Sequence, residues 1–165
     1  MRAAIIIAGG LLSLTACGQS PETAESSPAV QASAAPAVSN AVATPVGPLS
    51  AVDLRRVCRA GLAAIHGQQP EAIEITGLQG DVVNAQWRAP VDGGLMKAQC
   101  RTDGNQVVWK PLERPDPAAI RWMNQAGDPV NTFVLKGDVV TVTQTHPDAT
   151  IQAEDFNVPA TQEAV

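Results

Sequence analysis

The sequence is poor in the side chains that act as nucleophiles in acyl transfer. No serine follows Ser50, and the chain of 165 residues contains no tyrosine. Thr141, Thr143 and Thr145 alternate in a β-branched run, which is typical of the solvent face of a strand rather than of a catalytic site. Apart from its cysteines, the C-terminal part of the chain therefore offers no recognisable acyl-transfer nucleophile.

Two pairs of carboxylates have residue types that glycan hydrolysis uses, namely Glu71 with Glu74 and Glu154 with Asp155. Such chemistry requires one carboxyl group to act as an acid while the other acts as a base or nucleophile. It also requires a cleft that holds the two groups at a set separation. Ordinary exposed strand and turn carboxylates explain the same residues.

The two histidines lack the spacing of a metal site. His66 is expected at a helix end, where a positive charge is favourable, and His146 begins a His-Pro-Asp turn. The sequence contains no phosphate-binding loop, dinucleotide fingerprint or zinc-protease motif. We therefore expect neither a metal nor a cofactor. If the domain is an enzyme rather than a binding module, we expect a small hydrolase that uses carboxylates or His146.

Three cysteines, Cys17, Cys58 and Cys100, leave one thiol without an internal partner if two of them pair. Cys17 ends an apolar stretch that follows the positive start Met1-Arg2. The uncharged run from Ala3 to Leu14 is too short for a transmembrane helix, which needs about 20 apolar residues. A charged start, a short apolar run and small residues at its end are typical of a secretory signal.

The segment Leu14-Thr15-Ala16-Cys17 resembles the lipobox of bacterial lipoproteins, in which Leu and two small residues precede the lipidated cysteine. The resemblance implies that residues 1–16 are a signal peptide and that Cys17 is acylated and attaches the chain to a membrane. Gly18, in place of the Asp that commonly retains lipoproteins at the inner membrane, favours the outer membrane facing the periplasm. Several acyl chains on Cys17 would hold the chain firmly, because each buried methylene contributes about 0.8 kcal/mol.

Composition divides the rest of the chain into a linker, a domain and a tail. Residues 18–49 hold eight Ala, five Pro and five Ser but no Lys, Arg or aromatic residue, so they are expected to remain a disordered linker behind Cys17. Residues 50–157 are long enough for one domain. Residues 158–165 are expected to form a flexible tail.

The charge balance is acidic. The whole chain carries 11 Lys and Arg against 16 Asp and Glu, a formal net charge of −5. Nucleic-acid binding needs a basic face, so this balance argues against a nucleic-acid partner.

One amphipathic helix is predicted at the start of the domain, with Ser50 as its N-cap and Gly67 as its stop. Its apolar face consists of Leu54, Val57, Cys58, Gly61, Leu62 and Ile65. Arg55, Arg56 and Arg59 lie on the other side and are a candidate binding surface for a phosphate or carboxylate. A solvated polar helix face also explains them, and we favour that interpretation.

Beyond the helix the hydrophobic period changes to two, and turn residues separate short runs. The predicted strands cover residues 72–77, 81–88, 95–101, 106–110, 118–123, 130–136, 139–145 and 150–156. Connections this short require antiparallel neighbours. The fold class is therefore α+β, with one N-terminal helix packed on a curled antiparallel meander of about six to eight strands. The Pro-rich stretch 111–117 is expected to mark a crossing between two halves of the sheet.

Cys58 and Cys100 are both expected at the interface of helix and sheet. In an oxidising periplasm two such thiols are expected to form a disulfide. A redox or metal-binding role is less favoured, because neither the spacing of redox cysteines nor additional ligands are present.

The three tryptophans are the remaining candidates for binding. Trp87 and Trp109 alternate in phase with buried positions and are expected in the core. A place in the core is favoured for Trp122 too, but less strongly, because its neighbours Arg121 and Asn124 are polar. Trp122 is therefore the candidate for binding a cell-wall glycan or a periplasmic protein. We expect a lipid-anchored binding or envelope-interaction module without catalytic activity.

Overall fold

The computed structural model describes residues 47–163 of the chain. The predicted signal peptide, the lipidation site Cys17 and nearly all of the predicted linker lie outside the described residues. No helix in the described part is long and apolar enough to cross a membrane.

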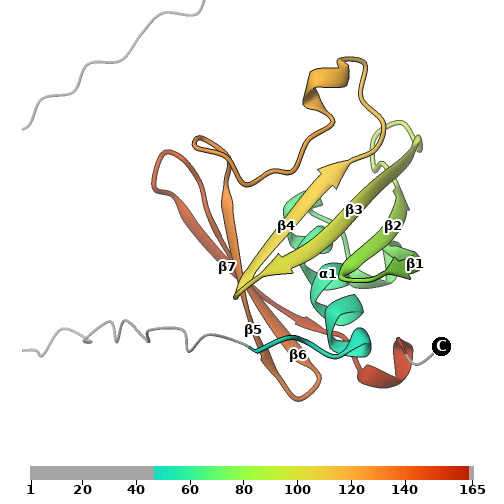
Figure 1. Cartoon of the computed structure of the whole chain (residues 1–165), viewed down its shortest axis with the longest axis vertical. Helices are drawn as coiled ribbons and strands as arrows, with labels where there is room; N and C mark the ends of the chain where they lie inside the picture. Colours follow the sequence, from blue (N-terminus) through green and yellow to red (C-terminus); the bar gives the residue numbers. More distant parts are fainter. Residues whose placement is uncertain (1–46, 164–165) are drawn as a thin grey trace, which may run out of the picture. The chain divides into compact units, whose positions relative to one another are not determined.

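One helix and one antiparallel sheet form the domain (Figure 1). The helix α1 spans Ala51–His66. The strands are β1 Glu74–Gln79, β2 Val82–Arg88, β3 Leu95–Asp103, β4 Gln106–Pro111, β5 Val130–Lys136, β6 Val139–Thr145 and β7 Ile151–Asn157. Their order in the sheet is the order in the chain, and β1 does not pair with β7. The predicted α+β class and the meander are thus confirmed, with seven strands in an open sheet.

The ends of α1 form as their residue types dictate. The Ser50 hydroxyl oxygen accepts the N–H of Asp53 at 3.1 Å, which satisfies a free donor of the first turn. Gly67 adopts φ 59° and ψ 39°, a left-handed conformation that costs glycine little. The helix therefore begins and ends where the sequence predicts.

One predicted strand, residues 118–123, is absent from the structure. Pro117–Ala119 instead form a short 3-10 helix, whose first free N–H, that of Ala118, donates to the Asp116 side chain at 3.0 Å. Pro115 and Pro117 have no N–H to give to a ladder. These residues belong to a crossover, 112–129, that connects β4 to β5.

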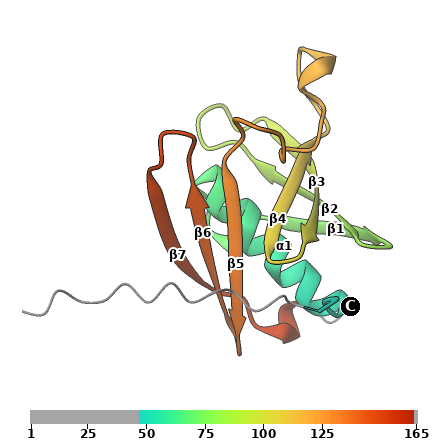
Figure 2. The same ribbon diagram turned by 60° about the vertical axis from the view of Figure 1, so that its left-hand side comes forward.

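The sheet is divided into two halves at this crossover. β4 and β5 share the single residue pair Gln106 and Thr132, and the Phe133 N–H donates to the Asn105 carbonyl at 2.9 Å. Figures 1 and 2 show β4 and β5 meeting at one end and diverging toward the other, with α1 between the two halves. The expected crossing between halves of the sheet is therefore present.

The core fills the space between α1 and the inner face of both halves. Cys58 on α1 and Cys100 on β3 are fully buried and form the predicted disulfide. In the second half, Phe133 on β5, Val142 on β6 and Phe156 on β7 turn toward the same core. A single helix thus supplies the apolar surface that both halves of the sheet need.

The chain beyond Asn157, expected to be a flexible tail, packs against the domain as far as Glu163. Val158 is fully buried, and its N–H donates to the Asp138 carbonyl at 2.8 Å. Ala160–Gln162 form a short 3-10 turn, and Glu163 is 3 % exposed. The side chain of Val158 joins the hydrophobic core, while Glu163 and the Val158 carbonyl face arginines of α1. These contacts are with residues about 100 positions away, so the local composition of the segment did not indicate them.

Gly61 allows α1 to approach β4 closely, and this contact can be tested. A Cβ atom at Gly61 would lie 2.6 Å from Cγ1 of Val107, a stiff β-branched side chain. We expect Gly61→Ala to destabilise the domain by about 1–3 kcal/mol through overpacking, despite the better helix propensity of alanine. Urea unfolding measures the change.

The matched control is the double variant Gly61→Ala with Val107→Ala. Truncation of Val107 removes the clash, so the cost of the alanine at position 61 should disappear when measured against Val107→Ala alone. A Gly61→Ala variant as stable as the wild type would show that the helix does not need this close approach.

Candidate functional site

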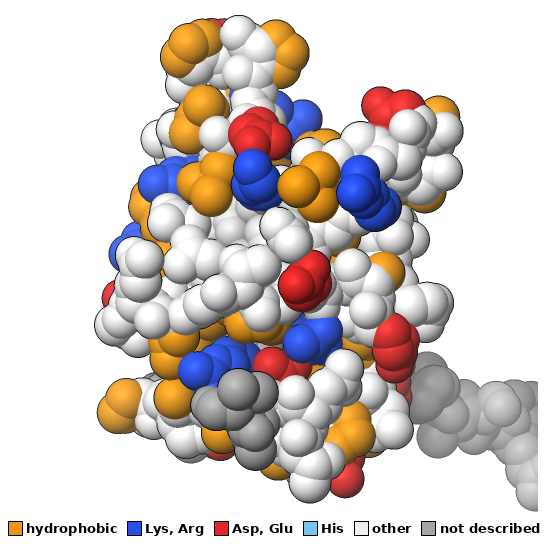
Figure 3. All heavy atoms as spheres, turned by 90° about the vertical axis from the view of Figure 1, so that its right-hand side faces the viewer, with side chains coloured by type: hydrophobic (Ala, Val, Ile, Leu, Met, Phe, Trp, Pro, Cys, Tyr) orange, Lys and Arg blue, Asp and Glu red, His pale blue; other side chains and the backbone are white. Residues whose placement is uncertain are grey.

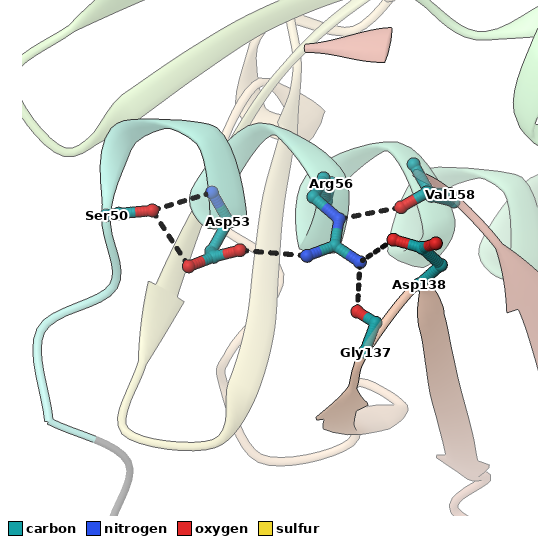
Figure 4. Close-up of polar contacts among 6 residues, drawn as sticks. All are labelled: Ser50, Asp53, Arg56, Gly137, Asp138 and Val158. Carbon is teal, nitrogen blue, oxygen red and sulfur yellow. Dashed lines mark hydrogen bonds and ion pairs between the residues drawn. The ribbon is translucent and has the colours of Figure 1, made fainter. Parts of the chain in front are cut away.

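Arg56 is buried, contrary to the solvated face expected from the sequence. Its Nε donates to the Val158 carbonyl at 2.6 Å, and another guanidinium nitrogen donates to the Gly137 carbonyl (Figure 4). A third contact joins it to Asp53 at 2.9 Å, and Asp138 lies 3.8 Å away. With 4 % of its surface exposed, Arg56 is not part of a surface that a partner can reach.

Arg59 is also buried and lies next to the end of the described chain. Its guanidinium contacts the Glu163 carboxylate and the carbonyl oxygens of Ile73 and Pro70. Arg55 donates to the backbone carbonyl of Glu163 at 3.1 Å and is partly exposed. The two arginines line a pocket of about 250 Å³, but Glu163 of the same chain already occupies both: its carboxylate contacts Arg59 and its backbone carbonyl contacts Arg55.

Trp122 lies on the crossover and is partly buried. The guanidinium carbon of Arg101 lies 4.7 Å from the centroid of its ring, and Nζ of Lys110 lies 5.3 Å away. Cations at these distances are attracted to the face of an indole ring. The ring is therefore engaged by side chains of β3 and β4, which weakens the case for Trp122 as a stacking platform for a sugar.

Charges of both signs are distributed over the surface. On the face seen in Figure 3, Lys and Arg side chains alternate with Asp and Glu side chains and do not gather into a patch of one sign. Arg121 and Asp128 form one such pair in the crossover, with contacts of 2.6 and 2.8 Å. Here the neighbouring Arg121 lowers the pKa of Asp128 by hydrogen bonding.

His66, at the end of α1, packs between two tryptophans. Its ring centroid lies 4.4 Å from that of Trp87 and 4.7 Å from that of Trp109. Trp87 is buried, as expected, and Trp109 is partly buried. Burial, and secondarily the positive charge of Arg114, lowers the pKa of His66 from 6.5 to about 4. His66 is therefore a partly buried residue that is neutral at neutral pH.

The carboxylate pairs differ in what they contact. The Glu74 carboxylate accepts from Gln86 Nε2 at 2.8 Å across the β1–β2 ladder, and that of Asp155 accepts from the Thr141 hydroxyl at 2.6 Å. Glu154 alternates with Asp155 on β7 and so faces the other side of the sheet. Glu71, Glu154 and Asp155 line a shallow pocket of about 190 Å³. Over residues 47–163, no three His, Cys, Asp or Glu side chains lie close enough together to hold a metal ion.

A third pocket opens where β4 and β5 diverge. It has a volume of about 140 Å³, and its apolar wall consists of Ile65 of α1, Trp109 of β4, and Met123 and Pro129 of the crossover. Asn131, Gln144 and His146 supply its polar groups. Of the residues that the sequence put forward for hydrolysis, this pocket contains only His146. Asp148, in the same turn, accepts the N–H of Thr150 at 2.9 Å.

Asn131 is the polar residue of this pocket that the sequence analysis missed. It stands on the inner face of β5, in phase with the buried Phe133, and is itself 4 % exposed. Its Nδ2 donates to the Pro129 carbonyl at 3.4 Å, whereas its Oδ1 has no donor among the described residues. The signal in the sequence is a polar residue at a position of β5 that lies on the same face as the apolar Phe133.

Comparison of the chain with protein-family models, with curated proteins and with solved structures found no match. The candidate sites are therefore judged from the chemistry of this chain.

The contacts of Arg56 with Asp53, Gly137 and Val158 should contribute strongly to stability. Arg56→Met removes the donors for the carbonyl of the buried Val158 and for that of Gly137, and it leaves Asp53 without its partner, so we expect the free energy of unfolding to fall on the order of 3 kcal/mol. Arg55→Met, which removes one contact of a partly exposed side chain, should cost less than about 1 kcal/mol. Denaturant unfolding of both variants tests the difference, and equal losses would contradict the assignment.

His66 should make stability depend on pH. Its pKa is lowered on folding, so between pH 6.5 and about 4 the unfolded chain binds a proton that the folded chain does not. Stability should therefore fall with the pH across this window, by about 3 kcal/mol in total from this residue.

The measurement is urea unfolding at pH 7 and at pH 4.5. His66→Gln should lose this part of the pH dependence, while His146→Gln, which keeps His66, should retain it. If the wild type and His66→Gln have parallel pH profiles, His66 is not the residue responsible.

Proposed function

We propose that this chain is a lipid-anchored binding module of the bacterial cell envelope, held at the outer membrane and facing the periplasm, without catalytic activity. The segment Leu14-Thr15-Ala16-Cys17 supports the anchor, and Gly18 supports the outer membrane. The Ala-, Pro- and Ser-rich residues that follow support a spacer between lipid and domain. The cell-wall glycan, a periplasmic protein or a small molecule of the envelope are the partners that such a location offers.

The observation that carries the binding function is the pocket between β4 and β5. It is concave and mostly apolar, and it has a few polar groups that converge on it, which is the usual composition of a ligand site. The polar pocket beside Arg59 is already supplied with a carboxylate by Glu163. Binding at the pocket between β4 and β5 needs no nucleophile, which agrees with the lack of serine after Ser50 and of tyrosine in the chain.

A small hydrolase acting on envelope glycan is the second candidate. What favours it is the shallow pocket that Glu71 shares with Glu154. The two carboxylates belong to the η1 turn (Pro70–Ala72) and to β7, and glycan hydrolysis uses a pair of carboxylates on either side of the bond that is cut. It ranks second because Asp155 is engaged with Thr141 and Glu74 with Gln86.

The anchor is tested by replacing the acylated residue in the full chain. Wild-type protein expressed in a bacterium with two membranes should incorporate labelled palmitate and sediment with the outer membrane. Cys17→Ser should do neither, because the chain then has no thiol at that position to carry the lipid. Ser13→Ala, just outside the Leu14–Cys17 segment, should behave like the wild type.

Two results would contradict the proposal. One is a wild-type protein without label, and the other is a Cys17→Ser variant that still sediments with the membrane. Labelled wild-type protein in the inner membrane would retain the lipid anchor but overturn the location inferred from Gly18.

A further inference from the structure

We propose that the pocket between β4 and β5 binds a small neutral molecule built on a single ring and carrying one O–H or N–H donor, with Asn131 Oδ1 as the acceptor. This inference rests on the proposed binding function and names the class of ligand. It follows from how the pocket is formed, from its size, from its charge and from one unpaired atom.

The chain itself holds the pocket open. Continuing the register of Gln106 and Thr132 by three residues would place Pro129 across from Trp109, and Pro129 has no N–H to continue the ladder. The Trp109 carbonyl instead accepts the N–H of Met123, in the crossover, at 2.8 Å. Since the donor to the Trp109 carbonyl comes from the crossover and not from β5, β5 does not pair with this end of β4.

The size of the pocket suits one ring. Its volume is about 140 Å³. An apolar protein cavity of roughly 150 Å³ is large enough to admit benzene. The indole of Trp109, with the side chains of Ile65 and Met123, provides the apolar wall against which such a ring can pack.

The charge of the lining favours a neutral ligand. Apart from the imidazole of His146, no residue that lines the pocket has an ionisable side chain. An ionised ligand would lose its hydration without gaining an opposite charge, which is costly. A neutral alcohol, phenol or amide avoids that cost.

The unpaired side-chain oxygen of Asn131 is the reason that the ligand should carry a hydrogen-bond donor. Its side chain is buried, its Nδ2 is engaged with the Pro129 carbonyl, and its Oδ1 is left without a partner. The neighbouring amide of Gln144 donates to the Ala64 carbonyl at 3.0 Å instead. A buried acceptor without a donor is unfavourable, so a ligand that donates to Oδ1 gains more than one that only fills the space.

The probe is phenol, compared with toluene, which has nearly the same shape and no donor. The protein is the full chain with Cys17→Ser, so that neither acyl chains nor detergent take up the probes. Titration is followed by the NMR shifts of the Asn131 side-chain amide and the Trp109 indole. We expect both probes to bind, with phenol favoured about five- to tenfold, the ratio that one hydrogen bond supplies.

Three variants distinguish the hydrogen bond to Asn131 Oδ1 from the apolar filling of the pocket. Asn131→Leu should stay folded, because it removes an unpaired polar atom, and it should lose the preference for phenol while still binding toluene. Thr132→Val, the next residue of β5 on the opposite face, should keep the preference. Met123→Trp, which fills the pocket from the crossover, should abolish binding of both probes.

Three results would overturn the inference. They are the absence of shifts with either probe, a preference for phenol that persists in Asn131→Leu, and binding that survives Met123→Trp. Failure of this kind would leave the lipid anchor untouched, since that is read from palmitate labelling. Phenol binding by a chain that proves not to be lipidated would support the pocket and contradict the anchor.

Discussion

The structure depends on the attachment of α1 to both halves of a divided sheet. The two halves share one residue pair, Gln106 with Thr132, so strand pairing alone does not join them firmly. The disulfide from Cys58 fastens α1 to β3 in the first half. Arg56 fastens the same helix to the turn after β5 and to the residue after β7. Because both fastenings leave from one helix, the helix sets the position of each half.

The opening between β4 and β5 is a consequence of this construction. A continuous ladder would have no gap, but it would also need an N–H where the chain has Pro129. The crossover supplies the missing donor through Met123, and in doing so it places apolar side chains around an opening that the helix does not fill. The same constraint leaves Asn131 buried without a donor for its oxygen. The pocket proposed for binding and the single residue pair between β4 and β5 therefore have the same structural cause.

Buried polar groups join distant parts of the chain in this small domain. Arg56 and Arg59 satisfy backbone carbonyls and carboxylates that come from distant parts of the chain. Such groups are costly to bury unless every donor finds a partner, and so they favour one arrangement of helix, turn and C-terminal residues over others. His66 adds to the same core in its neutral form, between the rings of Trp87 and Trp109.

Local patterns in the sequence determined the elements that depend on local physics. The caps of α1 at Ser50 and Gly67 and the seven strands follow from residue types and spacing, because caps, periodicity and turns act over a few residues. The disulfide between Cys58 and Cys100 joins residues 42 positions apart, but it was predictable because local periodicity places each cysteine on the apolar side of its element. Only the tertiary structure decided that Arg56 and Arg59 are buried, that residues 118–123 are not a strand, and that the chain packs as far as Glu163. It alone placed Asn131 and His146 beside Trp109. The reason is that these contacts join residues far apart in the chain, and an arginine has the same identity whether water or a distant carbonyl accepts its hydrogen bonds.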